Sequence, residues 1–344
     1  MSLRTACLIG FLLASATASA QPTPSGHKVT SLEIKILSTM LADEGFGEWG
    51  FAALVEVDGR RILFDTGAND DTVQRNLKAM GLDLSNVETV ILSHNHWDHT
   101  TGLLTLRRQF AATTPRALSK VYAGTGLFWP RITPAGQLDD RMAGIKRDFE
   151  ATGGSFIEVA KPIEILPGVW LTGPVPRIHP ERNWSNVGKV RTAAGDVEDT
   201  VPEDMTLVIQ TDKGLVYLFG CGHAGVINTL EHARKTIDPA PVKAVIGGLH
   251  LFAATDQHLA WTAAQLKSFG SSSSARTALG SNRSTVYATW SASRATPAWW
   301  ARSARRTPSP RALPPDASQS NTGTHKEGSD ERTARYFAGF VNAA

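Results

Sequence analysis

The chain has 344 residues, of which 42% are hydrophobic and 19% charged, with a formal net charge of +3. The apolar content excludes global disorder, and the length suits one large domain or two modest ones. The charge is unevenly distributed, because the residues from Ser271 onward contain 10 Lys+Arg and 4 Asp+Glu, whereas residues 21–270 have a net charge of −4. The small positive total therefore does not indicate nucleic-acid binding by the whole chain.

The first 20 residues have the pattern of a secretory signal peptide. Arg4 precedes a short apolar run, and Ala18-Ser19-Ala20 forms an A-x-A cleavage site before Gln21. The apolar run is too short to span a membrane. We therefore expect a periplasmic or secreted protein, whose mature chain would keep one cysteine, Cys221, and no intrachain disulfide.

Strand-like and helix-like patterns then alternate up to residue 269. Alternating or continuous apolar runs predict strands at 31–38, 51–57, 61–64, 87–92, 120–123, 156–159, 169–172, 206–210, 215–219 and 242–246. Helical spacing predicts helices at 71–80, 103–110, 225–235 and 256–269. Hairpin turns are indicated by Asp58-Gly59 and by Asp212-Lys213-Gly214. Such an order favours an α/β protein with two mixed sheets covered by helices.

A dense group of histidines follows the predicted strand at 87–92. The segment S-H-N-H-W-D-H contains His94, His96, Asp98 and His99. His94 and His96 alternate, so both side chains can point to one side of an extended segment. Imidazole suits Zn²⁺, and a carboxylate beside it suits a second ion or a hydrolytic site. The spacing therefore predicts a metal site rather than a polar loop that happens to be rich in histidine.

The sequence resembles the metallo-β-lactamase fold superfamily. The H-x-H-x-D-H pattern is its signature, and F-D-T-G at 64–67 matches a segment that precedes it. Three further segments, L-T-G-P-V-P-R at 171–177, G-C-G-H-A-G-V-I-N at 220–228 and G-G-L-H-L at 247–251, resemble the branch labelled dihydropterin-type aminobenzene-phosphate synthase-like. The similarity covers about residues 30–270. It implies an αββα sandwich of two mixed sheets flanked by helices, with metals at one sheet edge.

The resemblance implies a role for each residue of this group. His94 and His96 are expected to hold one Zn²⁺, and Asp98 and His99 a second. A hydroxide bridging the ions would be the nucleophile, since zinc lowers the pKa of a bound water toward about 7. Asp98 is also the candidate catalytic residue, because it could accept or relay a proton. Asp65 is expected either to orient a histidine or simply to form a turn.

Two further histidines follow predicted strands in the second half of the chain. His223 lies among glycines, which let the backbone approach an ion, and we predict that it is a metal ligand. His250 follows Gly247-Gly248 and is a candidate for metal binding or substrate contact. Cys221 could bind zinc as a thiolate, but a single buried cysteine is usually a small apolar residue, which is the interpretation we prefer.

The chain changes character after Gly270, so we expect three parts: a signal peptide at 1–20, the metallo-β-lactamase-like domain at 21–270, and a basic tail rich in Ser, Arg and Pro at 271–344. Composition predicts that the tail is disordered. The branch usually continues with A-H-C-T-G, whose histidine completes the site. Back-translation of residues 275–281 from the third base of each codon permits Ala-His-Cys-Thr-Gly-Ile, so one hypothesis is a frameshifted last segment, which resequencing of the gene tests. Two Zn²⁺ are expected in an intact member, and the second position is left open here.

We expect a metal-dependent hydrolase that uses a zinc-bound hydroxide on a small ester, phosphodiester or lactone-like substrate. One alternative is a truncated, weakly active or inactive metal-binding member of the same fold. Another is a pterin-linked phosphate synthase or transferase, as the branch label implies. Nucleic-acid binding through the basic tail is a further hypothesis. The favoured partner is a small molecule rather than nucleic acid, no membrane span is expected, and the oligomeric state is left open.

Overall fold

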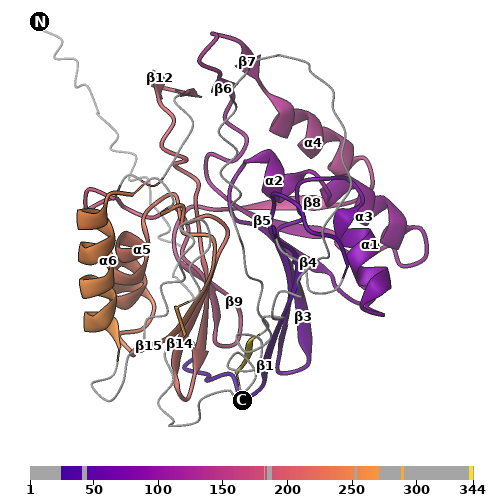
Figure 1. Ribbon diagram of the computed structural model, residues 1–344. Coiled ribbons are helices and arrows are strands. Elements are labelled where there is room, and N and C mark those ends of the chain that lie inside the picture. Colours follow the sequence, from indigo (N-terminus) through magenta and orange to yellow (C-terminus); the bar gives the residue numbers. More distant parts are fainter. Residues whose placement is uncertain are drawn as a thin grey trace, which may run out of the picture.

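The computed structural model describes residues 25–40, 45–181, 183, 188–251 and 254–270, and the backbone of two short strands at 288–289 and 341–343. Two central sheets lie between two layers of helices (Figure 1). The predicted αββα arrangement is thus confirmed. Among the described residues, no helix has the length and apolarity needed to cross a membrane.

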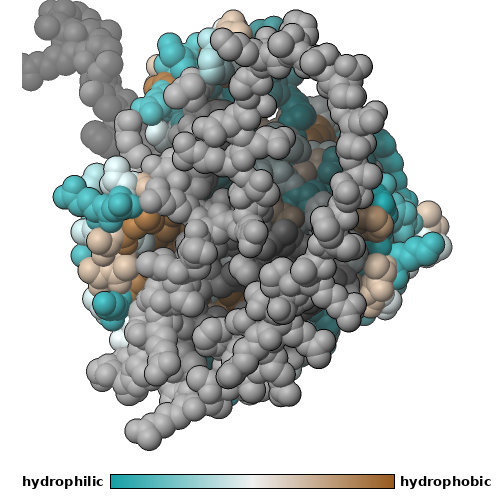
Figure 2. Space-filling view, viewed as in Figure 1, coloured by the Kyte–Doolittle hydropathy of each residue, from teal (hydrophilic) through white to brown (hydrophobic). Residues whose placement is uncertain are grey.

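The first sheet has seven strands in the order β17-β1-β2-β3-β4-β5-β8. Its strands are β1 (Leu32–Ser38), β2 (Ala52–Val57), β3 (Arg60–Phe64), β4 (Thr89–Leu92), β5 (Lys120–Gly124), β8 (Ser155–Val159) and β17 (Val341–Ala343). From β3 to β8 all neighbours are parallel. The helices on its outer face are α1 (Thr72–Ala79), α3 (Leu103–Ala111) and α4 (Arg141–Glu150). Figure 2 shows mainly hydrophilic residues on the visible flank formed by α1 and α3.

The second sheet has six strands in the order β16-β15-β14-β13-β10-β9. They are β9 (Ile163–Leu166), β10 (Val169–Leu171), β13 (Leu207–Thr211), β14 (Gly214–Phe219), β15 (Val242–Gly247) and β16 (Ala288–Thr289). The helices α5 (Val226–Thr236) and α6 (Asp256–Phe269) cover it. The pair β14–β15 is parallel, whereas β13–β14 is the predicted hairpin.

The third, small sheet, the strand β9 and the helices α2 (Trp97–Thr100) and α4 were not predicted from the sequence. The sheet has the order β12-β11-β6-β7. Its strands are β6 (Arg131–Ile132), β7 (Leu138–Asp139), β11 (Lys189–Thr192) and β12 (Gly195–Glu198). All residues of β7 and β12 are exposed, so these strands carry no apolar pattern. The helix α4 buries only Met142 and Phe149, which leaves its helical period weak.

Alternation along the strands separates the core into layers. On β3, Leu63 faces the helices of the first sheet, while Phe64 faces the second sheet. On β14, Leu218 packs between the sheets and Phe219 packs under α5 and α6. All four side chains are fully buried, and each such burial contributes roughly 1.5–3 kcal/mol of stabilisation. This packing fixes the two sheets face to face and holds their strand ends together.

The described residues cover only one of the three predicted parts of the chain, the domain at 21–270, over most of its length. The proposed signal peptide at 1–20 lies outside the described residues, as does the tail at 271–344 apart from the backbone of β16 and β17. These two strands pair with β15 and β1, respectively. The frameshift hypothesis and the predicted disorder of the tail therefore stay predictions.

Candidate metal centre

The candidate site lies where parallel strands of both sheets end. Asp65 directly follows β3, and the histidine-rich segment directly follows β4, its parallel neighbour. On the second sheet, His223 comes after β14 and His250 after the parallel strand β15. The carboxyl ends of parallel strands meet at one sheet edge, where ligands of α/β proteins commonly bind. The fold thus brings together side chains that are far apart in sequence.

The local backbone turns the histidines toward one another. His96 is extended and precedes the short helix α2 (Trp97–Thr100), which carries Asp98 and His99. The ring centroid of His94 lies 4.6 Å from that of His96 and 4.2 Å from that of His99. His223, from the other sheet, lies 4.7 Å from both His94 and His96. Four imidazoles from two sheets therefore share one small volume.

Three of these rings form a donor set that fits a metal ion. Ligand atoms of His94, His96 and His223 lie within 4.8 Å of one another. Within the described part of the chain, Nε2 of His94 and both ring nitrogens of His223 are buried without a hydrogen-bond partner. Buried polar atoms are normally paired, so unpaired nitrogens that converge are consistent with an ion as their partner.

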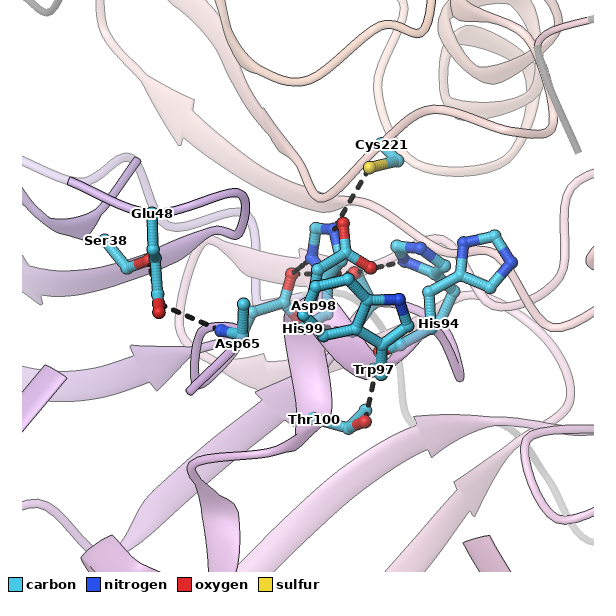
Figure 3. Close-up of polar contacts among 12 residues, drawn as sticks. Ser38, Glu48, Asp65, His94, Trp97, Asp98, His99, Thr100 and Cys221 are labelled. Atoms are coloured by element: carbon cyan, nitrogen blue, oxygen red, sulfur yellow. Dashed lines mark hydrogen bonds and ion pairs between the residues drawn. The ribbon is translucent and has the colours of Figure 1, made fainter. Parts of the chain in front are cut away.

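Asp65 connects the ends of β3 and β4 and orients His99. The carboxylate is fully buried and accepts hydrogen bonds from the Ser93 backbone N–H at 2.8 Å and the Ser93 hydroxyl at 2.7 Å. Its Oδ2 also lies 2.7 Å from Nδ1 of His99 (Figure 3). A carboxylate on Nδ1 leaves Nε2 of the imidazole to face the site. The orienting role expected for Asp65 is therefore borne out, and its backbone has a positive φ of 55°.

A cleft opens onto one side of the cluster. Its polar lining includes Asp98, His99, Cys221 and His250, and Trp49 and Phe51 form part of an apolar wall. Nε2 of His99 lies 3.0 Å from the Cys221 sulfur, which approaches from β14 (Figure 3). His250 stacks on His223 at 4.6 Å. The cleft therefore gives a small molecule access to ligand-type side chains.

Glycines allow the close approach of the second sheet to this site. A Cβ on Gly220 would lie 2.0 Å from the Ser93 hydroxyl oxygen, so a larger residue would push β14 away from Asp65. Gly222 has φ of 61°, a left-handed conformation that other residues rarely adopt. The Gly-Cys-Gly-His segment thus depends on its glycines to place Cys221 and His223.

Electrostatics keep most of the histidines neutral and Asp98 ionised. Burial lowers the pKa of His96 and of His250 to about 4, and that of His94 well below its ordinary value. Burial would raise the pKa of Asp98, but His99 and His96 lower it to about 2. Neutral imidazoles and an ionised carboxylate are the protonation states that metal binding requires.

His99 behaves differently from the other rings. Burial would lower its pKa, but contacts with Cys221, Asp65 and Asp98 raise it well above its ordinary value. An ion in the cleft would have to displace a proton from this group, so binding there must release protons.

Two side chains that the sequence did not indicate hold the loop between His94 and His96: Glu203, which is fully buried, and Arg141, which is partly buried. The carboxylate of Glu203 accepts a hydrogen bond from the Asn95 N–H at 3.1 Å and pairs with Arg131 at 2.6 Å. Arg141, from α4, donates to the Asn95 carbonyl at 2.5 Å. Glu203 contacts this loop and does not line the cleft. These contacts join segments that are far apart in the sequence, so only the folded structure reveals them.

Asp204 supports the His223 loop and makes folding pH-dependent. It is 2% exposed, and its Oδ2 accepts a hydrogen bond from the Ala224 N–H at 2.7 Å. Burial raises its pKa to about 7, compared with about 4 for an unfolded chain. Between these values the folded state binds more protons, so this group makes the free energy of unfolding fall as pH rises.

We therefore expect Asp204→Asn to become more stable relative to the unchanged protein as pH rises from about 4 to 7. The difference in free energy of unfolding between the variant and the unchanged protein should grow by about 1 kcal/mol per pH unit. Urea unfolding across this range measures it, with Asp212→Asn, an exposed hairpin residue, as the control. Parallel stability curves for Asp204→Asn and the unchanged protein would contradict this assignment.

Comparison with known proteins agrees with the fold and with the H-x-H-x-D-H segment. The sequence profile of the metallo-beta-lactamase superfamily matches residues 50–182, which include this segment. An uncharacterized protein of Methanocaldococcus jannaschii is 30% identical over 217 residues, covering 62% of this chain and 77% of that protein. The chain belongs to the metallo-beta-lactamase superfamily.

Two further proteins are similar to this chain over most of its length. A 7,8-dihydropterin-6-methyl-4-(beta-D-ribofuranosyl)-aminobenzene-5'-phosphate synthase of Methanocaldococcus jannaschii is 29% identical over 259 residues, covering 71% of this chain and 85% of that protein. A crystal structure of a metal-dependent hydrolase of the beta-lactamase superfamily has a TM-score of 0.56 at 25% identity, covering 70% of this chain and 84% of that one. The resemblance to this superfamily and to the synthase-like branch is thus confirmed.

Proposed function

We propose that this protein is a zinc-dependent hydrolase of a small ester, phosphodiester or lactone-like substrate. The observation that carries the proposal is the converging trio of His94, His96 and His223, with unpaired buried nitrogens, beside a cleft lined by Asp98 and His99. Membership of the metallo-beta-lactamase superfamily supports metal-dependent hydrolysis at a coarse level. Zinc is the ion that a histidine-rich donor set favours among common hydrolytic metals.

The donor set divides into two groups, which supports two ion positions. His94, His96 and His223 would hold one ion, and Asp98 and His99 would contribute to the other. His250 is the further candidate ligand, since its ring lies in a cluster with Cys221 and His223. When bound, zinc would supply Lewis-acid polarisation of a substrate oxygen and activation of water.

The protein's own residues would position the substrate and move protons. Asp98 is ionised at neutral pH and lines the cleft, so its carboxylate can accept a proton from an attacking water. Asp65 holds His99 in place through Nδ1. Trp49 and Phe51 would cover the apolar part of a substrate and exclude bulk water from it.

The test is turnover of bis(p-nitrophenyl) phosphate, a p-nitrophenyl ester and a simple lactone by the purified full chain. We expect activity that a chelator removes and that added Zn²⁺ restores, with none in the Asp98→Asn variant. Metal binding without turnover of any substrate would instead favour the alternative of a catalytically weak or inactive metal-binding member of the same fold. Turnover that resists complete metal removal would contradict the proposal.

A second candidate function is a synthase reaction of the kind named for the Methanocaldococcus jannaschii relative. The 29% identity over 85% of that protein favours it. Formation of the pterin product in that name by the purified chain, with no hydrolysis of the generic substrates, would support this candidate over the hydrolase.

We also propose that the protein acts outside the cytoplasm, on the pattern of its first 20 residues. N-terminal sequencing of the protein from a cell fraction tests this. A chain that starts at Gln21 in the exported fraction supports it, and a chain that keeps its first residues in the cytosol contradicts it.

A further inference from the structure

The loops that carry His223 and His250 are joined by one buried side chain, that of Asn183. Its amide nitrogen donates one hydrogen bond to the Gly222 carbonyl at 2.6 Å and another to the Leu249 carbonyl at 2.9 Å. Asn183 is 5% exposed and is 39 and 66 positions away from these acceptors. Each acceptor immediately precedes one of the two histidines in the sequence. A single amide therefore bridges the segments that follow β14 and β15.

This bridge requires the amide group of asparagine. A carbonyl oxygen only accepts hydrogen bonds, and the amide nitrogen has two N–H donors, one for each carbonyl. An aspartate of the same shape would set a carboxylate oxygen against both carbonyl oxygens. Because Gly222 and Leu249 are buried as well, loss of the amide would remove a hydrogen bond from two buried backbone groups.

The connection between β10 and β11, which contains Asn183, also holds the other side of His223. The Arg177 guanidinium, from the same connection, donates to the His223 carbonyl. The peptide groups before and after this histidine are thus both held. Glu181 anchors the connection, because its buried carboxylate accepts hydrogen bonds from two backbone N–H groups in the first turn of α5, at 2.7 and 3.1 Å.

His250 has a backbone conformation that depends on such support. Its φ is 44°, in the left-handed region that residues other than glycine adopt only at a cost. The hydrogen bond from Asn183 to the preceding carbonyl restricts the peptide group between Leu249 and His250. The His250 ring stacks on that of His223, with the centroids 4.6 Å apart and the planes at 28°. A rotation of this peptide group would change the distance between the rings.

We propose that Asn183 is a positioning residue that fixes the distance and the orientation between His223 and His250. The inference rests on the proposed metal centre, but Asn183 acts through the backbone of the two loops and is not itself a ligand. Groups that orient metal ligands typically change metal affinity by about 10–100-fold. Because Asn183 is one step further from the ion, we expect an effect at the lower end of this range.

Zinc titration of the purified full chain, beside urea unfolding of the same proteins, tests this role. Asn183→Ala should bind zinc about tenfold more weakly, and Asn183→Asp at least as weakly, because neither has a donor for the carbonyls. Asn183→Ser keeps one donor, so its affinity should lie between that of Asn183→Ala and that of the unchanged chain. It also provides a milder variant if the loss of the whole amide prevents folding.

Another buried asparagine provides the matched control. Asn76, on α1, is 2% exposed and donates to the carbonyls of Leu37 and Phe46, at 2.8 Å each. Asn76→Ala should therefore lose stability in urea as Asn183→Ala does, but it should keep its zinc affinity.

The visible spectrum of the cobalt-loaded proteins is a second measurement, because it reports the geometry of the ligands rather than the stability of the fold. We expect the bands of Asn183→Ala to shift and those of Asn76→Ala to stay. Unchanged zinc affinity and an unchanged spectrum in Asn183→Ala would overturn the role of Asn183 and leave the proposed metal centre standing. Equal changes in both variants would do the same. Failure of the unchanged chain to bind zinc at all would overturn both this inference and the proposed function.

Discussion

His94→Ala should lose nearly all bound zinc and reduce hydrolytic activity by about 10³-fold or more. A ring nitrogen of His94 belongs both to the cluster with His96 and His223 and to the cluster with His99 and Cys221. Removing it therefore weakens both proposed ion positions. An ion that contributes several kcal/mol to transition-state stabilisation accounts for a loss of this size, since each 1.4 kcal/mol corresponds to about tenfold in rate. Zinc content and kcat/KM of the purified variant are the measurements.

A comparison among histidines makes this expectation specific. His250→Ala should lose less zinc than His94→Ala, because His250 belongs to one cluster only. The control is His232→Ala, on α5, where Nε2 lies 3.2 Å from the Thr172 carbonyl oxygen. We expect this variant to keep its zinc and its activity. Equal zinc content in His94→Ala and His232→Ala would show that the histidine cluster is not the binding site.

Asp65→Ala should lower the free energy of unfolding by about 3–5 kcal/mol. The substitution leaves the Ser93 N–H, the Ser93 hydroxyl and Nδ1 of His99 without their common acceptor in a fully buried place. Each unpaired buried group costs roughly 1–3 kcal/mol. Zinc affinity should fall as well, by about 10–100-fold, because His99 loses the group that orients it. Urea unfolding and zinc titration measure the two effects.

The variant Asp65→Asn separates the backbone conformation from the hydrogen bonds. Asparagine tolerates the positive φ of this position, but its amide nitrogen cannot accept a hydrogen bond. We expect an intermediate loss of stability and of zinc affinity. If Asp65→Asn and Asp65→Ala both kept full zinc affinity, the orienting role of Asp65 would be wrong, whatever their stability.

Local patterns were sufficient to predict most of the architecture. The alternation in 31–38 predicted β1 within one residue, and the helical period of 256–269 predicted the bounds of α6. Both elements bury one face, so their period is visible in the sequence. The third sheet could not be predicted in this way, because its short strands are largely exposed and are held by pairing with distant segments.

The candidate site divides in the same manner. His94, His96, Asp98 and His99 are close in sequence, so their spacing alone indicated metal chemistry. The contact of Glu203 with the Asn95 N–H joins residues 108 positions apart. Because every residue type except proline has a backbone N–H, the identity of residue 95 gives no sign of this hydrogen bond. The polar contact of Cys221 was also hidden, since only the folded chain places it against His99.

The division of the site between two sheets has a consequence for how the protein is made. His99 and Cys221 are 122 positions apart, and they meet only when both sheets have formed and docked. A chain emerging from the ribosome therefore presents the first histidines long before their partners exist. A site that has only half of its ligands should bind an ion weakly. We therefore expect tight metal binding only after His223 has been synthesised and the two sheets have docked.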